Sequence, residues 1–260
     1  MRDKKFRYFV TSKRRKIRYS QVNSKKKLMV IFFHGFMSDM EGKKPKSFEK
    51  FSKKIQTGFL RFEYSGHGKS SNKLTEGNIS KWTDDACQLI NSKINKKKVI
   101  FIGSSMGSWI ALKLIPKFRK QMAGFIGIGS APDFSDELMW KKFPRNIKDI
   151  INKKGIYNVK NEYGDPYPIT KQFIKDGKKN KILKKFLNSF DLPVFLFHGN
   201  KDKSVPIKYS RKTLKLFKSD NKKLFVIKNG DHSLSRKSDL KKICKELYYI
   251  VSNLRQNFKE

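Results

Sequence analysis

Cysteine is scarce in this 260-residue sequence, and no apolar run is long enough to cross a bilayer. The only two cysteines, Cys87 and Cys244, fall on apolar positions of predicted helices. We therefore expect buried free thiols in a reducing compartment, and the disulfide-framed class of small secreted proteins is excluded. The longest apolar run near the N-terminus, 28–33, has about a third of the length that a membrane span needs.

Several signatures of cofactor sites and targeting signals are also missing. The sequence contains no H-E-x-x-H pattern, no paired-cysteine zinc spacing and no phosphate-binding loop. We therefore expect neither a metal nor any other cofactor. Residues 1–20 are basic but lack a continuous apolar segment, so we expect no secretory signal. The alternation of Phe6, Tyr8 and Val10 instead predicts a first strand.

Acidic residues number only 22 against 61 basic ones, which gives a net charge of +39. Such a charge is typical of nucleic-acid-binding proteins. Only 11 of the basic residues are arginine, however, the side chain that reads base edges best, and the lysines are spread along the whole chain. A bias toward A/T-rich codons explains this composition, so we predict no specific nucleic-acid partner and only a weak attraction to anionic surfaces.

The most informative stretch that is present is Gly-Ser-Ser-Met-Gly at 103–107. It follows a short apolar run, 98–102, that predicts a buried strand, and it precedes an apolar helix at 109–115. A G-x-S-x-G pattern between a strand and a helix is typical of a nucleophile elbow. Its two glycines allow the close approach of strand and helix, which leaves Ser105 exposed as the candidate nucleophile.

Strands and helices alternate around this stretch. We predict an N-terminal hairpin from 5–11 and 16–22, strands at 28–33, 58–64, 98–102, 121–129, 192–197 and 223–227, and helices that begin near Pro45 and Ser80 or cover 109–115 and 240–254. We expect Ser80 to cap its helix. This alternation predicts an α/β fold with a mostly parallel central sheet and helices on both faces.

One segment, 132–190, interrupts the alternation with aromatic residues and prolines but no strand periodicity. We interpret the chain as a single domain, 1–260, with this segment inserted as a cap over the carboxyl ends of the strands. Trp140 and Phe143 are candidate residues of a substrate pocket in the cap.

A nucleophilic serine needs a base to take its proton and an acid to orient that base. In elbow-type hydrolases both follow the serine along the chain, on loops after later strands. His232 follows the last predicted strand and is the candidate base. His34 and His198 end strands as His-Gly pairs, where we expect structural roles, and His67 lies in a glycine-rich loop that we place near the site but not at its centre.

Asp202 follows the penultimate strand and is the candidate acid. Asp231 adjoins the base, but neighbouring side chains on a loop point apart, and Asp133 is the possible substitute. An oxyanion needs two backbone donors, which we assign to the N–H groups of Phe36 and Met106.

These motifs, in this order, resemble those of the α/β-hydrolase superfamily over essentially the whole chain. A narrower resemblance is to the mitochondrial abhydrolases that are palmitoyl-protein thioesterases and acyl-glucuronide esterases. It is carried by the segments 33–44, 61–66, 103–109 and 154–159. His34 departs from that pattern, where a proline is expected, at a position that supplies no oxyanion donor. The resemblance implies S-acylated protein substrates, and the lysine-rich composition indicates a cytoplasmic, bacterial-type counterpart, or a mitochondrial protein if the source is eukaryotic.

The leading hypothesis is a serine thioesterase or esterase that works through an acyl-enzyme. A carboxylesterase for small polar esters such as acyl glucuronides differs only in the shape of its cap. A third hypothesis is a non-catalytic protein whose basic surface binds nucleic acid or membrane. The presence of Ser105, Asp202 and His232 together argues against it, because a binding protein does not need all three.

Overall fold

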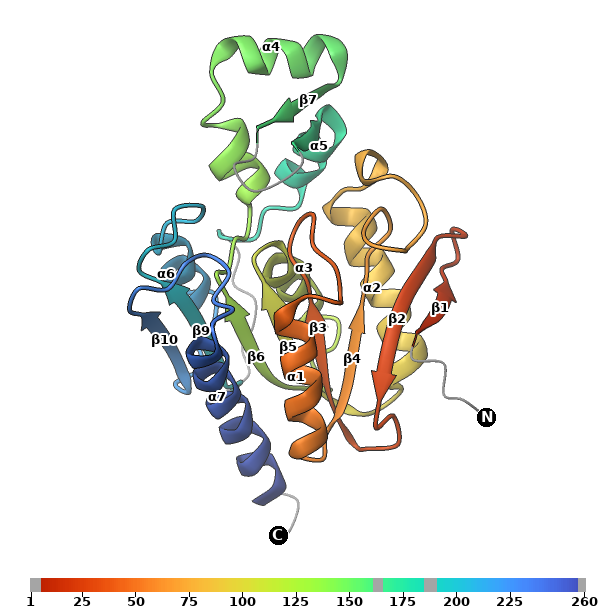
Figure 1. The fold of residues 1–260 in the computed structure, drawn as a ribbon, viewed down its shortest axis with the longest axis vertical. Coiled ribbons are helices and arrows are strands. Elements are labelled where there is room, and N and C mark those ends of the chain that lie inside the picture. The colour runs from red at the N-terminus through yellow and green to blue at the C-terminus, as the bar shows by residue number, and fades with distance from the viewer. Residues whose placement is uncertain (1–5, 161–165, 185–190, 257–260) are drawn as a thin grey trace.

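The computed structural model describes residues 6–160, 166–184 and 191–256, in which an eight-stranded sheet forms the centre of the molecule (Figure 1). In spatial order its strands are β1 (Arg7–Val10), β2 (Lys16–Val22), β4 (Gly58–Phe62), β3 (Leu28–Phe33), β5 (Lys98–Ser104), β6 (Met122–Ile128), β9 (Val194–Gly199) and β10 (Lys222–Ile227). Strand β2 is antiparallel to both of its neighbours, and the other strand pairs of this sheet are parallel. The predicted mostly parallel sheet is confirmed.

The central strands are continuously apolar because both of their faces are covered. Successive residues of β3 point to opposite sides, so that Val30 joins one layer of the core and Ile31 the other. Ile100 and Phe101 divide in the same way on the neighbouring strand β5. The side-chain alternation of a strand thus builds two apolar layers from one uninterrupted apolar run.

Helices cover both faces of the sheet, as predicted. On one face, α1 (Lys43–Lys54) and α7 (Lys237–Gln256) lie side by side and bury Phe48 and Leu247 (Figure 1). On the other face, α2 (Ile79–Ile94) and α3 (Met106–Leu114) bury Trp82 and Ile110. Helix α6 (Lys208–Leu214) packs against β9 and β10. Cys87 and Cys244 are buried free thiols on α2 and α7, as expected.

The segment between β6 and β9 forms a separate layer above the sheet in Figure 1. Its described part contains a π-helical turn (Ser135–Trp140), α4 (Arg145–Lys154), β7 (Ile156–Val159), β8 (Tyr167–Thr170) and α5 (Lys171–Lys179). Although the sequence showed no strand periodicity here, β7 and β8 pair as a small antiparallel sheet. Each has only four residues, which is too short for an alternating pattern to stand out.

The expected cap of helix α2 is wrong by two residues. Helix α2 begins at Ile79, and the side chain of Asn78 accepts the N–H of Lys81 at 2.9 Å. Ser80 lies inside the helix, where its hydroxyl and N–H both donate to the carboxylate of Asp176 on α5. Asparagine caps as well as serine does, so the sequence alone did not distinguish the two positions.

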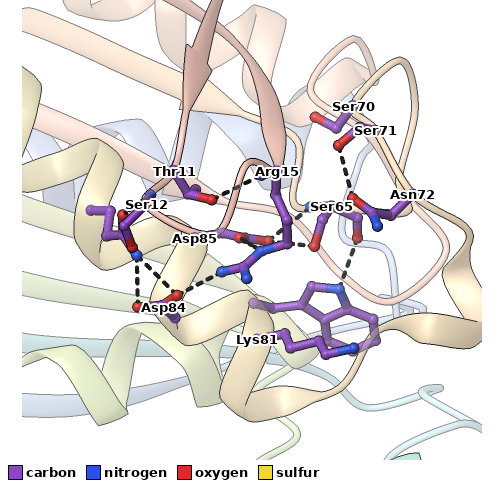
Figure 2. Close-up of polar contacts among 12 residues, drawn as sticks. Thr11, Ser12, Arg15, Ser65, Ser70, Ser71, Asn72, Lys81, Asp84 and Asp85 are labelled. Atoms are coloured by element: carbon purple, nitrogen blue, oxygen red, sulfur yellow. Dashed lines mark hydrogen bonds and ion pairs between the residues drawn. The ribbon is translucent and has the colours of Figure 1, made fainter.

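An ion-pair network, buried at Asp85 and partly exposed at Asp84, joins the β1–β2 hairpin to α2 and to the loop after β4 (Figure 2). The Arg15 guanidinium contacts Asp84 and Asp85, each at 2.6 Å. The second oxygen of Asp85 accepts the N–H and the hydroxyl of Ser65, whose carbonyl accepts the indole N–H of Trp82. Because every polar atom of Asp85 is used, the loop that starts at Ser65 is held firmly against the helix.

Candidate active site

Ser105 lies in the sharp turn between β5 and α3, with a positive φ of 52° and ψ of −117°. Left-handed backbone is strained for a residue with a Cβ, and such strain is concentrated at functional sites. A Cβ on Gly103 would lie 2.5 Å from the Cα of Ser108, and one on Gly107 would lie 2.1 Å from the carbonyl oxygen of Phe33. Only glycine therefore fits at positions 103 and 107, two residues before and two after the serine, as the sequence predicted.

His232 lies in the loop between β10 and α7, and Ser105 follows β5, which is separated from β10 by the two strands β6 and β9. Its Nε2 is 3.0 Å from Ser105 Oγ, and its Nδ1 is 2.7 Å from Asp202 Oδ2. A carboxylate only accepts hydrogen bonds, so Nδ1 carries the proton and Nε2 is free to accept the serine hydroxyl. The structure thus brings the three sequence-predicted residues into one hydrogen-bonded chain.

Asp202 is enclosed, with 1% of its side chain exposed against 28% for His232. Its Oδ1 accepts the N–H groups of Ser204 and Val205, at 2.9 and 2.8 Å. Burial alone raises the pKa of a carboxyl group, but the hydrogen bonds from His232 and Val205 outweigh it, and the pKa of Asp202 is lowered. The acid therefore stays ionised beside the imidazole.

The other two acidic candidates have different partners. Asp133 accepts the N–H groups of Ile182 and Leu183, at 2.8 and 3.1 Å, and so connects the beginning of the inserted segment to its later part. Asp231 accepts the N–H of Leu234 and closes the turn that carries His232. The described hydrogen bonds therefore leave Asp202 as the carboxylate on the imidazole.

His198 packs beneath the acid rather than beside the serine. Its Nε2 is 2.8 Å from the carbonyl oxygen of Val205, and its Nδ1 is 2.8 Å from Ser210 Oγ. Burial lowers the pKa of His198, so the ring is neutral and Nε2 donates to that carbonyl. His198 thereby supports the turn whose amides bind Asp202, in agreement with the structural role that we expected.

Phe36 and Met106, the predicted oxyanion donors, flank the serine. Met106 is the first residue of α3, where N–H groups have no partner in a preceding turn. Phe36 follows Gly35, on which a Cβ would lie 3.5 Å from the Cβ of Ser105. The Gly35 carbonyl accepts from His34 Nδ1 at 2.8 Å and from the N–H of Ser38 at 3.3 Å. Since a peptide unit is planar, these bonds direct the Phe36 N–H to the opposite side.

His34 and His67 form a buried pair behind this loop, with ring centroids 5.0 Å apart. Burial lowers the pKa of His34 to about 4 and that of His67 to about 3, so both rings are neutral near pH 7. The position of His67 agrees with our expectation of a place near the site but not at its centre. Neither ring is hydrogen-bonded to Ser105 in the described contacts.

A cleft of about 800 Å³ opens above Ser105. One group of its lining residues is apolar, and four of these belong to the inserted segment. The group comprises Phe32, Phe36, Pro45, Ala131, Phe134, Leu138, Met139, Tyr167 and Val205. A second group is polar or basic and comes mainly from α1 and the His232 loop: Ser38, Lys43, Lys44, Asp231, Ser233, Ser235 and Arg236. The catalytic candidates Ser105 and His232 therefore lie in a cleft of mixed character.

Trp140 and Phe143, our candidate pocket residues, are not among those that line this cleft. The Trp140 ring instead lies under the ammonium group of Lys178, at 4.6 Å from the ring centroid. The lining residues Leu138 and Met139 come from the same helical turn. Sequence pattern located the segment but not its inward face, because a six-residue π-helical turn has no recognisable period.

No group of three side chains that could hold a metal ion occurs within residues 6–160, 166–184 and 191–256. Among the helices of these residues, none has an apolar stretch long enough for a membrane span.

Comparison with known proteins connects this geometry to a family. A family model described as serine aminopeptidase, S33, matches residues 24–163. The mitochondrial palmitoyl-protein thioesterase ABHD10 of Rattus norvegicus is 30% identical over 213 residues, which are 81% of this chain and 71% of that protein.

Two solved structures are similar over nearly the whole chain. A putative hydrolase from Agrobacterium vitis S4 superposes with a TM-score of 0.89 at 27% identity and covers 94% of this chain and 98% of its own. The α/β-hydrolase domain-containing protein 10 from mouse has a TM-score of 0.85 at 26% identity and covers 96% and 99%. The predicted α/β-hydrolase fold and the narrower resemblance are both confirmed by these matches.

Proposed function

This chain is an ester-cleaving hydrolase that belongs to the serine aminopeptidase S33 family of α/β hydrolases, and on that basis we propose that Ser105, His232 and Asp202 are its catalytic triad. The observation that carries the proposal is the hydrogen-bonded chain from Ser105 Oγ through the imidazole to the buried carboxylate. A structural histidine would have no reason to contact a strained serine at the floor of an open cleft.

The proposed reaction has two halves. Ser105 Oγ attacks the acyl carbonyl carbon while its proton moves to His232 Nε2. The oxyanion that forms accepts hydrogen bonds from the N–H groups of Phe36 and Met106. The C–S or C–O bond then breaks as the imidazolium returns the proton to the leaving group. Water, deprotonated by the same imidazole, then cleaves the acyl-serine ester and restores the hydroxyl.

We propose fatty acyl thioesters and esters as substrates because the apolar lining can enclose an acyl tail. Each methylene that leaves water contributes about 0.8 kcal/mol, or roughly four-fold in binding. The printed name of the rat relative, a palmitoyl-protein thioesterase, supports an S-acylated substrate. The amide-cleaving activity in the family description fits less well. An aminopeptidase must bind a free ammonium group, and Asp231 is the sole carboxylate among the described lining residues.

The test uses octanoyl esters of one alcohol and of the matching thiol. We expect the wild-type protein to hydrolyse both, with the thioester cleaved at least as efficiently. His232→Ala should lose about 10³-fold or more in kcat, because the serine then has no base. Full activity in a folded His232→Ala variant would contradict the proposal.

A second candidate, a carboxylesterase for small polar esters, is favoured by the polar group of lining residues. Its substrates would gain little from acyl length. A kcat/KM profile that is flat or highest at acetyl would select this candidate, whereas a rise with chain length until the cleft is full selects the fatty acyl substrate.

A further inference from the structure

The polar part of the cleft has no role in holding an acyl tail. Its wall is formed by the first turn of α1, the loop after His232 and the first residues before α7. Three basic side chains line it, Lys43, Lys44 and Arg236, against the single carboxylate of Asp231. That carboxylate already accepts the N–H of Leu234. The polar part therefore carries an excess of positive charge beside the proposed nucleophile.

Lys44 differs from the surface lysines of this lysine-rich chain. Its Nζ donates to the carbonyl oxygen of Ser233 at 2.5 Å and lies 3.4 Å from Ser235 Oγ, and both of these acceptors are neutral. In the described part of the chain no carboxylate lies within ion-pair distance of it. Burial lowers the pKa of Lys44 to about 8, and the nearby Asp231 carboxylate offsets only part of that effect.

Asp231 attracts the Lys44 ammonium group only through space, without an ion pair among the described contacts, so burial of this cation costs free energy that an anionic ligand in direct contact would recover. Arg236 is already paired with Asp239, at 2.8 Å, so it has less charge to offer. Lys43 is exposed and Lys44 is not fully enclosed, so both can approach a ligand in the cleft. Helix α1 adds no competing anion, since its first turn contains no acidic residue.

We propose that the polar part of the cleft binds the leaving group of the substrate, and that this leaving group carries a phosphate that Lys44 and Lys43 bind. The inference rests on the proposed function, because it needs the acyl group to react at Ser105. A phosphate monoester carries close to two negative charges near neutral pH and so matches two ammonium groups that make no ion pair among the described contacts better than a carboxylate does. The phosphate takes no part in bond making. The thiol or alcohol leaves with its phosphate intact after it accepts the proton from His232.

The experiment compares octanoyl thioesters of three small thiols: mercaptoethanol, mercaptoethyl phosphate and mercaptopropionate. For the wild-type protein we expect kcat/KM to be about ten-fold higher for the phosphate than for the neutral thiol. Lys44→Gln should remove most of that preference while the neutral thioester is still cleaved. Lys44→Arg should retain it, because the charge is kept. Lys50→Gln is the matched control, since Lys50 is an exposed lysine on the same helix.

Three outcomes would overturn the inference. Equal kcat/KM for the phosphate and neutral thioesters removes the phosphate site. A higher kcat/KM for the carboxylate thioester than for the phosphate thioester would mean that the polar part of the cleft binds monoanions rather than phosphate. A proportional loss for all three thioesters in Lys44→Gln means that Lys44 acts only by holding the Ser233 carbonyl, and thus the His232 loop. Hydrolysis of the neutral thioester separates these results from a failure of the proposed function, in which no thioester is cleaved.

Discussion

The turn around Ser105 and the inserted segment above it are held by different kinds of interaction. Around Ser105 the constraints are steric and come from the backbone. Gly103 and Gly107 leave no room for a Cβ, and the N–H of Ser105 donates to the carbonyl of Ile128 on the next strand at 2.9 Å. Such contacts permit almost no substitution without displacement of the serine.

The inserted segment is attached by side chains. The Asp176 carboxylate on α5 accepts the N–H and the hydroxyl of Ser80 on α2, at 2.9 and 2.6 Å, and the side-chain amide of Asn78 donates to Gln172 Oε1 at 2.9 Å. The ring of Phe36 stacks on Phe173 of α5, with ring centroids 5.3 Å apart. These are contacts between side chains, whereas those around the serine are backbone contacts that exclude any side chain at two positions.

This difference indicates how the chain separates two tasks. The sterically fixed geometry lies at the strand ends that carry the proposed catalytic residues, whereas several residues of the proposed acyl-binding part of the cleft lie on the inserted segment. Phe36 contacts both regions, because it follows Gly35 beside Ser105 while its ring packs against Phe173 of the inserted segment. The predictions below test whether the two tasks are separable.

The largest effect should follow a change at the turn itself. Ser105→Ala should lower kcat about 10³-fold or more, because the nucleophile is gone while the fold is unaltered. Ser104→Ala is the neighbouring control and should change kcat far less. Steady-state hydrolysis of an octanoyl thioester measures both, and equal losses in the two variants would mean that the serine was assigned wrongly.

Asp202→Asn should produce the next largest effect, a loss in kcat of about 10²–10⁴-fold. An amide at this position favours the wrong imidazole tautomer without removing the ring. Asp133→Asn should instead retain kcat on a short ester and lower the free energy of unfolding by about 1 kcal/mol, since it weakens one buried hydrogen bond. Steady-state kinetics and thermal unfolding measure the two effects. A large loss of kcat in Asp133→Asn together with normal kcat in Asp202→Asn would contradict the assignment of the acid.

Changes in the apolar lining should affect acyl selectivity rather than the rate on short esters. We expect Met139→Ala to flatten the rise of kcat/KM with acyl length, because it removes apolar surface from the cleft. Trp140→Ala, on the same turn, should flatten it less, since Trp140 does not line the cleft. For each variant, kcat/KM is measured with thioesters from acetyl to dodecanoyl, which gives the slope against acyl length. A larger decrease of this slope in Trp140→Ala than in Met139→Ala would support the substrate-pocket role that the sequence predicted for Trp140.

The smallest effect concerns the +39 charge. We expect only weak DNA or RNA binding without sequence preference, which weakens steeply with added salt because it consists of phosphate neutralisation. Fluorescence anisotropy with two unrelated oligonucleotides at low and physiological salt measures this. Sub-micromolar, sequence-selective binding at physiological salt would show that the basic surface has a function of its own.

The sheet, and the meeting of the three candidate triad residues at one edge of it, could be predicted from the sequence for one physical reason. Parallel strands are continuously apolar, and reacting groups of this fold lie directly after their carboxyl ends. A short pattern such as G-x-S-x-G at the end of a strand therefore also indicated which residues, far apart in the sequence, lie close together in the fold. His232 and Ser105 are 127 residues apart, yet each was located by its position after a strand.

The inserted segment could not be predicted in the same detail. The four-residue strands β7 and β8 and the π-helical turn have no resolvable period, so the inward-facing side chains were not distinguished from the outward-facing ones. Lys44 was missed for another reason. In a chain with this many lysines, only its partners and its position in the cleft set it apart.

Covalent labelling with a fluorophosphonate probe, followed by mass spectrometry of the digested protein, tests the central claim most directly. The probe reacts only with a serine that a neighbouring base has activated. We expect one equivalent of label on Ser105 in the wild-type protein, and none in folded His232→Ala or Ser105→Ala. A label on Ser104, or label on Ser105 that persists at the same rate without His232, would contradict the triad.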